Sequence, residues 1–366
     1  MKIGIIDADL VGRKKHRFPN LACMKISYWY KQQGHVVELL PDYNHIENYD
    51  KVFISKVFTD TEVPSEILNL SWVEHGGTGF YYDNAQPLPY EIEHSMPDYH
   101  LYDDFVQMAL ENGVKPKELT YYTDFSIGFT TRGCIRGCSF CVNKNYRQCF
   151  KHSPISEFLD PDRKYICLLD DNVLSCKDWK SIFEELNTTG KRFQFKQGMD
   201  ERLLTDEKCE IIFNSKWIGD FIFAFDNIKD RKIVVRKLRM IRQHTNKIPK
   251  FYCFCAYNHD QPDTYSDEFW VKDIEDLFER IKILIDHKSL PYIMRYKDFK
   301  KSPYRGMYVT IARWCNQPSY LKKLSFREFC KKTLEHGSES AIRYAVEFET
   351  KYPHIAEKYF DMKWGE

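Results

Sequence analysis

The chain has 366 residues, which is enough for two domains or for one large domain with additions. Its 54 Lys and Arg residues against 53 Asp and Glu residues give a net charge of +1, so the charge balance does not indicate a nucleic-acid partner. No apolar run has the length of a membrane span, and the N-terminus reads as a strand rather than a signal peptide. We therefore expect a cytoplasmic protein whose 12 cysteines are kept reduced.

The first part of the chain alternates apolar strands with a helical pattern. The predicted strands are Lys2–Ile6, His35–Leu40, Lys51–Ser55 and Ser71–Gly79, with a helix at Pro19–Gln33 between the first two. This alternation favours an open, mainly parallel sheet, so residues 1–115 are predicted to be a small Rossmann-like domain. The glycines of Gly76–Gly79 allow either a phosphate cradle or, as we favour, a tight turn. A linking segment with a helix at Asp103–Asn112 follows.

Residues 116–300 repeat the strand-and-helix pattern six times. The predicted strands are Phe125–Thr131, Tyr165–Leu169, Arg192–Lys196, Phe221–Phe225, Lys250–Ala256 and Pro291–Arg295, and the helices between them are Asp178–Leu186, Asp206–Asn214, Asp230–Gln243 and Asp267–His287. Six β/α units are too few for a closed eight-unit barrel, so we predict an open, partial (β/α)6 barrel. Residues 301–366 are predicted to be a helical C-terminal extension, with helices at Phe326–Leu334 and Ser338–Tyr352.

Three cysteines follow the first barrel strand with the spacing C-x3-C-x2-C. Cys134, Cys138 and Cys141 lie within eight residues, so one turn points three thiolates at one metal centre. Three ligands leave one iron of a [4Fe-4S] cluster open to an outside ligand, which is the arrangement that binds S-adenosylmethionine (SAM). Gly133 and Gly137 let the backbone approach a cluster. A structural zinc site or unrelated core cysteines are the alternatives, but zinc sites usually add a second ligand pair.

The motif, its lead-in Phe125-Ser-Ile-Gly-Phe-Thr-Thr-Arg-Gly133 and its sequel Val142-Asn-Lys resemble the radical SAM superfamily. The aromatic Phe140 before the third cysteine belongs to that signature and would shield the cluster. The resemblance also implies the partial barrel, a [4Fe-4S] cluster and SAM as cofactors. The first domain loosely resembles the cobalamin-binding-type domain of many family members. Its Asp-x-His-x-x-Gly motif is absent here, so we expect no cobalamin.

Polar residues follow the barrel strands, where such barrels gather their chemistry. The resemblance implies that Asp170 and Asp171 hold the SAM amine, and that Gln197, Asp200 and Arg202 hold its ribose or carboxylate, with Asp226 as a further candidate. The alternative for each acidic residue is a helix cap. Cys253 and Cys255 share one strand face, and we interpret them as buried core thiols rather than ligands of a second cluster.

The sequence thus predicts a radical SAM enzyme. An electron donor such as flavodoxin or ferredoxin would reduce the cluster, SAM would be cleaved to a 5′-deoxyadenosyl radical, and the radical would abstract hydrogen from a substrate that the sequence does not identify. A cobalamin-dependent radical SAM methyltransferase and a non-catalytic iron–sulfur protein for electron transfer or sensing are the alternatives.

Overall fold

The computed structural model describes residues 1–13, 15–143 and 145–365. The chain divides into two compact units, Met1–Lys196 and Gln197–Glu366. Both are built from parallel strands and helices, which confirms the predicted α/β class. Among the described residues, no helix is long and apolar enough to cross a membrane.

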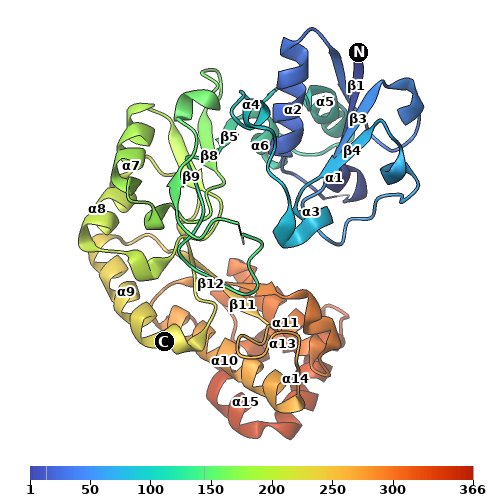
Figure 1. The fold of residues 1–366 in the computed structure, drawn as a ribbon. Coiled ribbons are helices and arrows are strands. Elements are labelled where there is room, and N and C mark those ends of the chain that lie inside the picture. Colours follow the sequence, from blue (N-terminus) through green and yellow to red (C-terminus); the bar gives the residue numbers. More distant parts are fainter. Residues whose placement is uncertain (14, 144, 366) are drawn as a thin grey trace. The chain divides into compact units, whose positions relative to one another are not determined.

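The first unit begins with a four-stranded parallel sheet of order β2-β1-β3-β4 (Figure 1). Its strands are β1 (Lys2–Asp7), β2 (Val36–Leu39), β3 (Lys51–Ser55) and β4 (Val73–Gly76). The helices of this part are α1 (Ala8–Gly12), α2 (Leu21–Gln32), α3 (Thr78–Tyr81), α4 (Tyr90–Glu93), α5 (Asp103–Glu111) and α6 (Thr120–Thr123). All four predicted strands and the two predicted helices are confirmed, with small shifts at their ends.

The two central strands of this sheet, β1 and β3, are buried on both faces, as is usual for apolar strands of a parallel sheet. Successive side chains of a strand point to opposite faces. Phe53 therefore packs with Ile3 and Ile5 in a core that includes residues of α2, whereas Val52 and Ile54 pack in a second core on the other face. The strand order places β1 between β2 and β3, which is the arrangement of a doubly wound sheet.

A second parallel sheet, of order β5-β8-β9, completes the first unit. It consists of β5 (Phe125–Gly128), β8 (Tyr165–Leu168) and β9 (Arg192–Phe195), with α7 (Trp179–Thr188) between the last two. A short antiparallel pair, β6 (Thr131–Arg132) with β7 (Phe150–Lys151), follows β5. The predicted strand Phe125–Thr131 is thus interrupted, because a buried carboxylate takes the N–H groups of Thr130 and Thr131.

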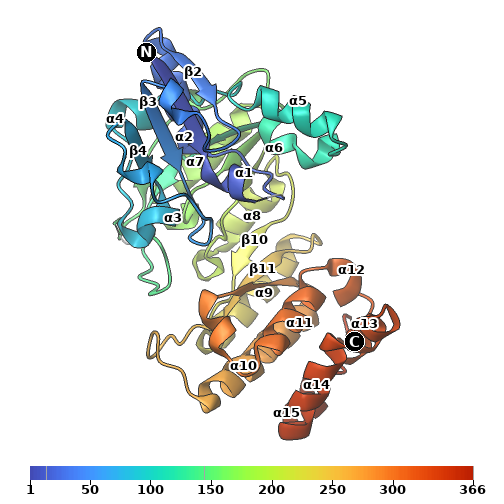
Figure 2. The same ribbon diagram turned by 90° about the vertical axis from the view of Figure 1, so that its right-hand side faces the viewer.

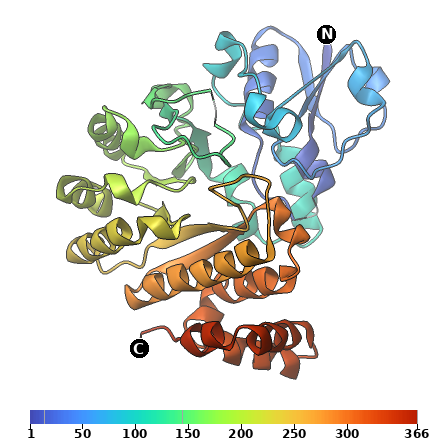
Figure 3. The same ribbon diagram turned by 60° about the horizontal axis from the view of Figure 1, so that its bottom comes forward.

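The second unit has the parallel sheet β10-β11-β12. Its strands are β10 (Ile222–Ala224), β11 (Lys250–Cys255) and β12 (Leu290–Arg295). The helices are α8 (Asp206–Asn214), α9 (Arg231–His244), α10 (Asp267–Asp286), α11 (Arg305–Cys315), α12 (Pro318–Leu321), α13 (Phe326–Glu335), α14 (Ser340–Lys351) and α15 (Pro353–Tyr359). The C-terminal helices α13 to α15, in red, pack on one another and on α10 and α11 (Figures 2 and 3).

The predicted barrel strands all exist, three in each unit. A single six-stranded barrel, and the boundaries at residues 115 and 300, remain predictions. The helical character predicted for residues 301–366 is confirmed.

Candidate functional site

The three cysteines lie in a loop that β6 and β7 close at its base. The loop begins at Gly133, which has a φ of +90° and is buried. A Cβ atom at this position would lie 2.0 Å from the carbonyl oxygen of Gln148 on the returning segment. Only glycine allows both this backbone conformation and this approach. The Cys134 N–H then donates to the Tyr146 carbonyl at 3.2 Å, so the loop begins and ends in contact with itself.

The three cysteine side chains are half-buried, and N–H donors lie near the sulfurs of Cys134 and Cys141. The Arg136 N–H and the Asn172 side-chain amide each lie 3.4 Å from the Cys134 sulfur. The Asn143 N–H lies at the same distance from the Cys141 sulfur. N–H groups directed at sulfur stabilise thiolates, and around a metal cluster they also set its reduction potential. These N–H groups would stabilise the thiolate forms of Cys134 and Cys141.

Asp170 fixes the start of this loop. Its carboxylate is 2% exposed and accepts four hydrogen bonds, from the N–H and hydroxyl groups of Thr130 and Thr131, at 2.6–2.9 Å. Burial raises the pKa of Asp170 to about 6 against the effect of these donors. Asp170 thus positions the start of the loop. That Asp170 contacts the SAM amine directly stays a prediction.

Asp171 continues the same function one residue further along the chain. Its Oδ2 accepts from the Gly133 N–H at 2.8 Å and from the Asn143 side-chain amide at 3.2 Å. One carboxylate oxygen thereby joins the residue before the first cysteine to a residue after the last. Phe140 is half-buried in the same loop, and its carbonyl accepts from the Tyr82 hydroxyl at 2.8 Å. Its cluster-shielding role remains a prediction.

Sequence reasoning assigned no role to Asn143, Asn172 or Tyr82. Asn172 follows the two aspartates after β8, so its place in the chain gave a signal, although amides at strand ends are usually helix caps. Tyr82 gave none, because its contact with Phe140 joins residues 58 positions apart.

The remaining predicted residues lie in the second unit, where Asp200 and Arg202 form one cluster. Asp200 is 6% exposed and caps the turn Glu201–Leu203 by accepting from the Arg202 N–H. The Arg202 Nε donates to Asp200 at 2.7 Å, and its Nη1 donates to Asp230 at 2.9 Å. These two carboxylates hold the pKa of Arg202 above its usual range, although burial acts in the other direction. The guanidinium is fixed in place, as a binding group must be, but two of its donors are already engaged.

Glu201 and Asp226 are further acids of this unit. Glu201 is 2% exposed, and burial together with the neighbouring Asp200 raises the pKa of its carboxyl to about 8. Asp226 accepts from the Phe254 N–H at 2.9 Å, and burial raises the pKa of its carboxyl as well. Both therefore keep a proton at a higher pH than exposed acids do. Sequence reasoning missed Glu201, because glutamates are rarely buried and nothing local marked this one.

Gln197 is exposed, and the structure assigns it no specific contact. Cys253 and Cys255 both point from β11 into the core, where they are 0% and 1% exposed. Burial raises the pKa of the Cys253 thiol to about 12, and it raises the pKa of the Cys255 thiol as well. Their interpretation as core thiols is supported by this burial, since metal-binding cysteines are usually thiolates near neutral pH.

Among the described residues, no three His, Cys, Asp or Glu side chains lie close enough together to hold one metal ion. An iron–sulfur cubane binds each cysteine through a different iron, so its ligands do not converge on one point.

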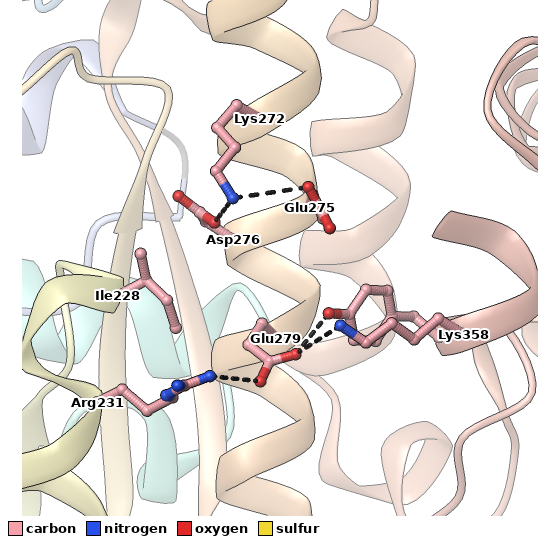
Figure 4. Close-up of a pocket in the computed structure, with 8 residues that line it drawn as sticks. Ile228, Arg231, Lys272, Glu275, Asp276, Glu279 and Lys358 are labelled. Atoms are coloured by element: carbon pink, nitrogen blue, oxygen red, sulfur yellow. Dashed lines mark hydrogen bonds and ion pairs between the residues drawn. The ribbon is translucent and has the colours of Figure 1, made fainter. Parts of the chain in front are cut away.

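A charged pocket of about 200 Å³ lies elsewhere in the second unit (Figure 4). Its charges are paired across it: Arg231 and Lys358 with Glu279, and Lys272 with Glu275 and Asp276. None of the predicted site residues lines it. We assign it no chemistry.

Comparison with known proteins finds similarity only at the level of fold. No protein-family model and no curated protein matches the sequence. A solved structure of the radical S-adenosylmethionine methyltransferase TsrM from Kitasatospora setae, with cobalamin and a [4Fe-4S] cluster bound, aligns over 80% of this chain and 74% of that chain (TM-score 0.49, 11% identity). Another TsrM structure, with tryptophan substrate and a SAM analog, covers 80% and 72% (TM-score 0.50, 10% identity). At this identity the second alignment shows a shared α/β fold.

Proposed function

We propose that the chain is a radical SAM enzyme whose [4Fe-4S] cluster is held by Cys134, Cys138 and Cys141. The observation that carries the proposal is the cysteine loop itself. Three thiols with the family spacing lie in one loop, and N–H groups are directed at the sulfurs of Cys134 and Cys141. The shared fold with a radical SAM methyltransferase supports the same class. When bound, the cluster would supply the electron that cleaves SAM to methionine and a 5′-deoxyadenosyl radical, which abstracts hydrogen from a substrate.

The residues of this chain have distinct parts in the proposal. Asp170 and Asp171 hold the loop in its binding shape through their contacts with Thr130, Thr131 and Gly133. Phe140 is proposed to exclude water from the cluster. The proposed SAM contacts are Asp170 and Asp171 for the amine, and Gln197, Asp200, Arg202 and Asp226 for the rest of the molecule.

The proposal includes three structural parts and two further expectations. The parts are a Rossmann-like domain at residues 1–115, a partial barrel at 116–300 and a helical extension at 301–366. The expectations are an electron donor such as flavodoxin or ferredoxin and a cytoplasmic location, which suits a chain with 12 cysteines.

The decisive experiment asks whether SAM is cleaved. Protein reconstituted anaerobically with iron and sulfide is reduced in the presence of SAM, and 5′-deoxyadenosine is measured. The Cys138→Ala variant, treated identically, is the control for unspecific cleavage. Cluster-dependent 5′-deoxyadenosine supports the enzyme. A cluster that forms and is reduced but never yields 5′-deoxyadenosine would leave the non-catalytic electron-transfer protein as the better reading.

A cobalamin-dependent methyltransferase is the second candidate, because the structural neighbour is a methyltransferase and the chain has an N-terminal parallel sheet. The glycine turn after β4 does not add to this case. A Cβ at Gly77 would lie 2.3 Å from the Lys56 carbonyl oxygen, and one at Gly79 would lie 2.9 Å from the same atom. The close approach of Lys56 accounts for both glycines, as expected for a tight turn. Equilibrium dialysis against hydroxocobalamin decides between the candidates.

A further inference from the structure

One hydroxyl group connects the end of the N-terminal sheet to the cysteine loop. The Tyr82 hydroxyl, just after α3, donates to the Phe140 carbonyl at 2.8 Å. The Cys141 N–H belongs to the same peptide group, and it donates to the Cys138 carbonyl at 3.1 Å. The peptide between Phe140 and Cys141 is therefore held at both its oxygen and its nitrogen, which fixes the direction in which Cys141 leaves the backbone.

Tyr82 is itself held firmly. Its backbone has φ 44° and ψ −106°, a conformation that residues with a side chain adopt only where their surroundings impose it. The preceding turn packs on the residues after β3: the Gly79 N–H donates to the Lys56 carbonyl at 2.9 Å, and the Thr78 hydroxyl donates to the Val57 carbonyl at 3.1 Å. A continuous series of contacts thus leads from the N-terminal sheet to Phe140.

The base of the loop is joined to the same part of the chain by polar side chains gathered around the Glu93 carboxylate. Arg132 in β6 lies 3.3 Å from Glu93, which ends α4 and is 9% exposed. His152, directly after β7, lies 3.5 Å from the same carboxylate, and Lys25 of α2 lies 3.7 Å from it. Glu93 thereby contacts β6 through Arg132, and it contacts His152, the residue that follows β7. The loop is thus held near Phe140 by Tyr82 and at its base by Glu93, both from the first hundred residues.

We propose that residues 1–115 act as a clamp on the cysteine loop, and that Tyr82 is a positioning residue that orients Cys141. The clamp is a property of the protein fold, while its effect on a cluster rests on the proposed function. The domain would then serve the first step of catalysis by shaping the cluster site, in addition to any ligand it binds.

Tyr82→Phe removes the hydroxyl and keeps the ring. Tyr81→Phe is the matched control, because Tyr81 is the neighbouring residue, is similarly exposed (44% against 38%), and places its hydroxyl 3.0 Å from His75 instead of on the loop. Amide hydrogen exchange of the cluster-free full-length chain reports on the clamp alone. Loss of one exposed hydrogen bond predicts about two- to fivefold faster exchange of the Cys141 amide in Tyr82→Phe. Tyr81→Phe should match the wild type there.

The reconstituted protein gives the second readout. The freed peptide lets Cys141 turn relative to the Asn143 N–H that is directed at its sulfur. The EPR g-values and midpoint potential of the cluster should therefore shift in Tyr82→Phe and not in Tyr81→Phe. Unchanged exchange in Tyr82→Phe would overturn the clamp. Faster exchange with identical EPR spectra and potentials would overturn the orienting role of Tyr82. If the wild type forms no cluster, the proposed function fails, and the exchange measurement still decides the clamp.

Discussion

Replacing Gly133 with alanine tests how strictly the cysteine loop depends on one close backbone approach. A Cβ at this position would lie 2.0 Å from the Gln148 carbonyl oxygen, whereas heavy atoms in contact lie about 3.5–4.0 Å apart. Relief would therefore require a shift of about 1.5 Å. Such a shift would break the bonds from Cys134 N–H to Tyr146 and from Gly133 N–H to Asp171.

The expected effect is the sum of three contributions. The left-handed backbone costs alanine about 1–2 kcal/mol. Loss of the hydrogen bond from the Cys134 N–H to the Tyr146 carbonyl costs about 1 kcal/mol more, and loss of the bond from the Gly133 N–H to the Asp171 carboxylate costs about 1.5–3 kcal/mol. The total of about 3.5–6 kcal/mol lowers the population of the native loop by roughly a few hundredfold or more. The loop bears this loss locally, so the rest of the chain should stay folded.

Gly34→Ala is the matched control, because Gly34 has a similar φ of +79° but its Cβ would meet nothing within 4 Å. It should cost only the backbone contribution and leave the cluster intact. Iron content and the EPR signal after anaerobic reconstitution report on the loop, and circular dichroism reports on the fold. A folded Gly133→Ala protein with wild-type iron content and EPR signal would refute the argument.

Three further predictions concern the three cysteines, Arg202 and Asp7. Replacing Cys134, Cys138 and Cys141 with Ala should abolish the EPR signal of the reduced cluster and the shift of that signal on adding SAM. The wild type should contain about four iron atoms per chain. A signal that survives the substitutions, or iron near eight per chain, would contradict a single cluster in this loop. Arg202→Ala should weaken SAM binding about ten- to a hundredfold in an EPR titration. It should also lower thermal stability, because the buried Asp200 loses a partner. Unchanged SAM affinity would place Arg202 outside the site. Burial raises the pKa of Asp7 from 3.8 to about 6, so its contribution to stability is fully present below pH 3.8 and is lost as pH rises through 6. The free energy of unfolding of the wild type should therefore gain about 2 kcal/mol on that of Asp7→Asn between pH 7 and pH 4, and a constant difference would show that Asp7 has an ordinary pKa.

Local patterns in the sequence were sufficient for the parallel strands, for the cysteine motif and for helices α2, α5, α7 to α10, α13 and α14, but not for α1, α3, α4, α6, α11, α12 or α15. The strands are short runs rich in apolar residues, and a helix such as Asp206–Asn214 is preceded by its own capping residue, Thr205, so neither depends on distant contacts to be recognised. The interruption after Gly128 was not visible in the sequence. It arises because Asp170, 39 residues beyond Thr131, takes N–H groups that the strand would otherwise use.

The roles of individual polar residues were decided by tertiary structure. The sequence determined which residues are acidic and that they follow strands, and this placed Asp170, Asp171, Asp200 and Asp226 in the candidate set. It did not determine that Asp170 is saturated by two threonines, that Arg202 is held by Asp200 and Asp230, or that Glu201 is buried. Hydrogen bonds and burial depend on which segments meet in space, and pairs such as Tyr82 with Phe140, 58 residues apart, leave no periodic signal along the chain.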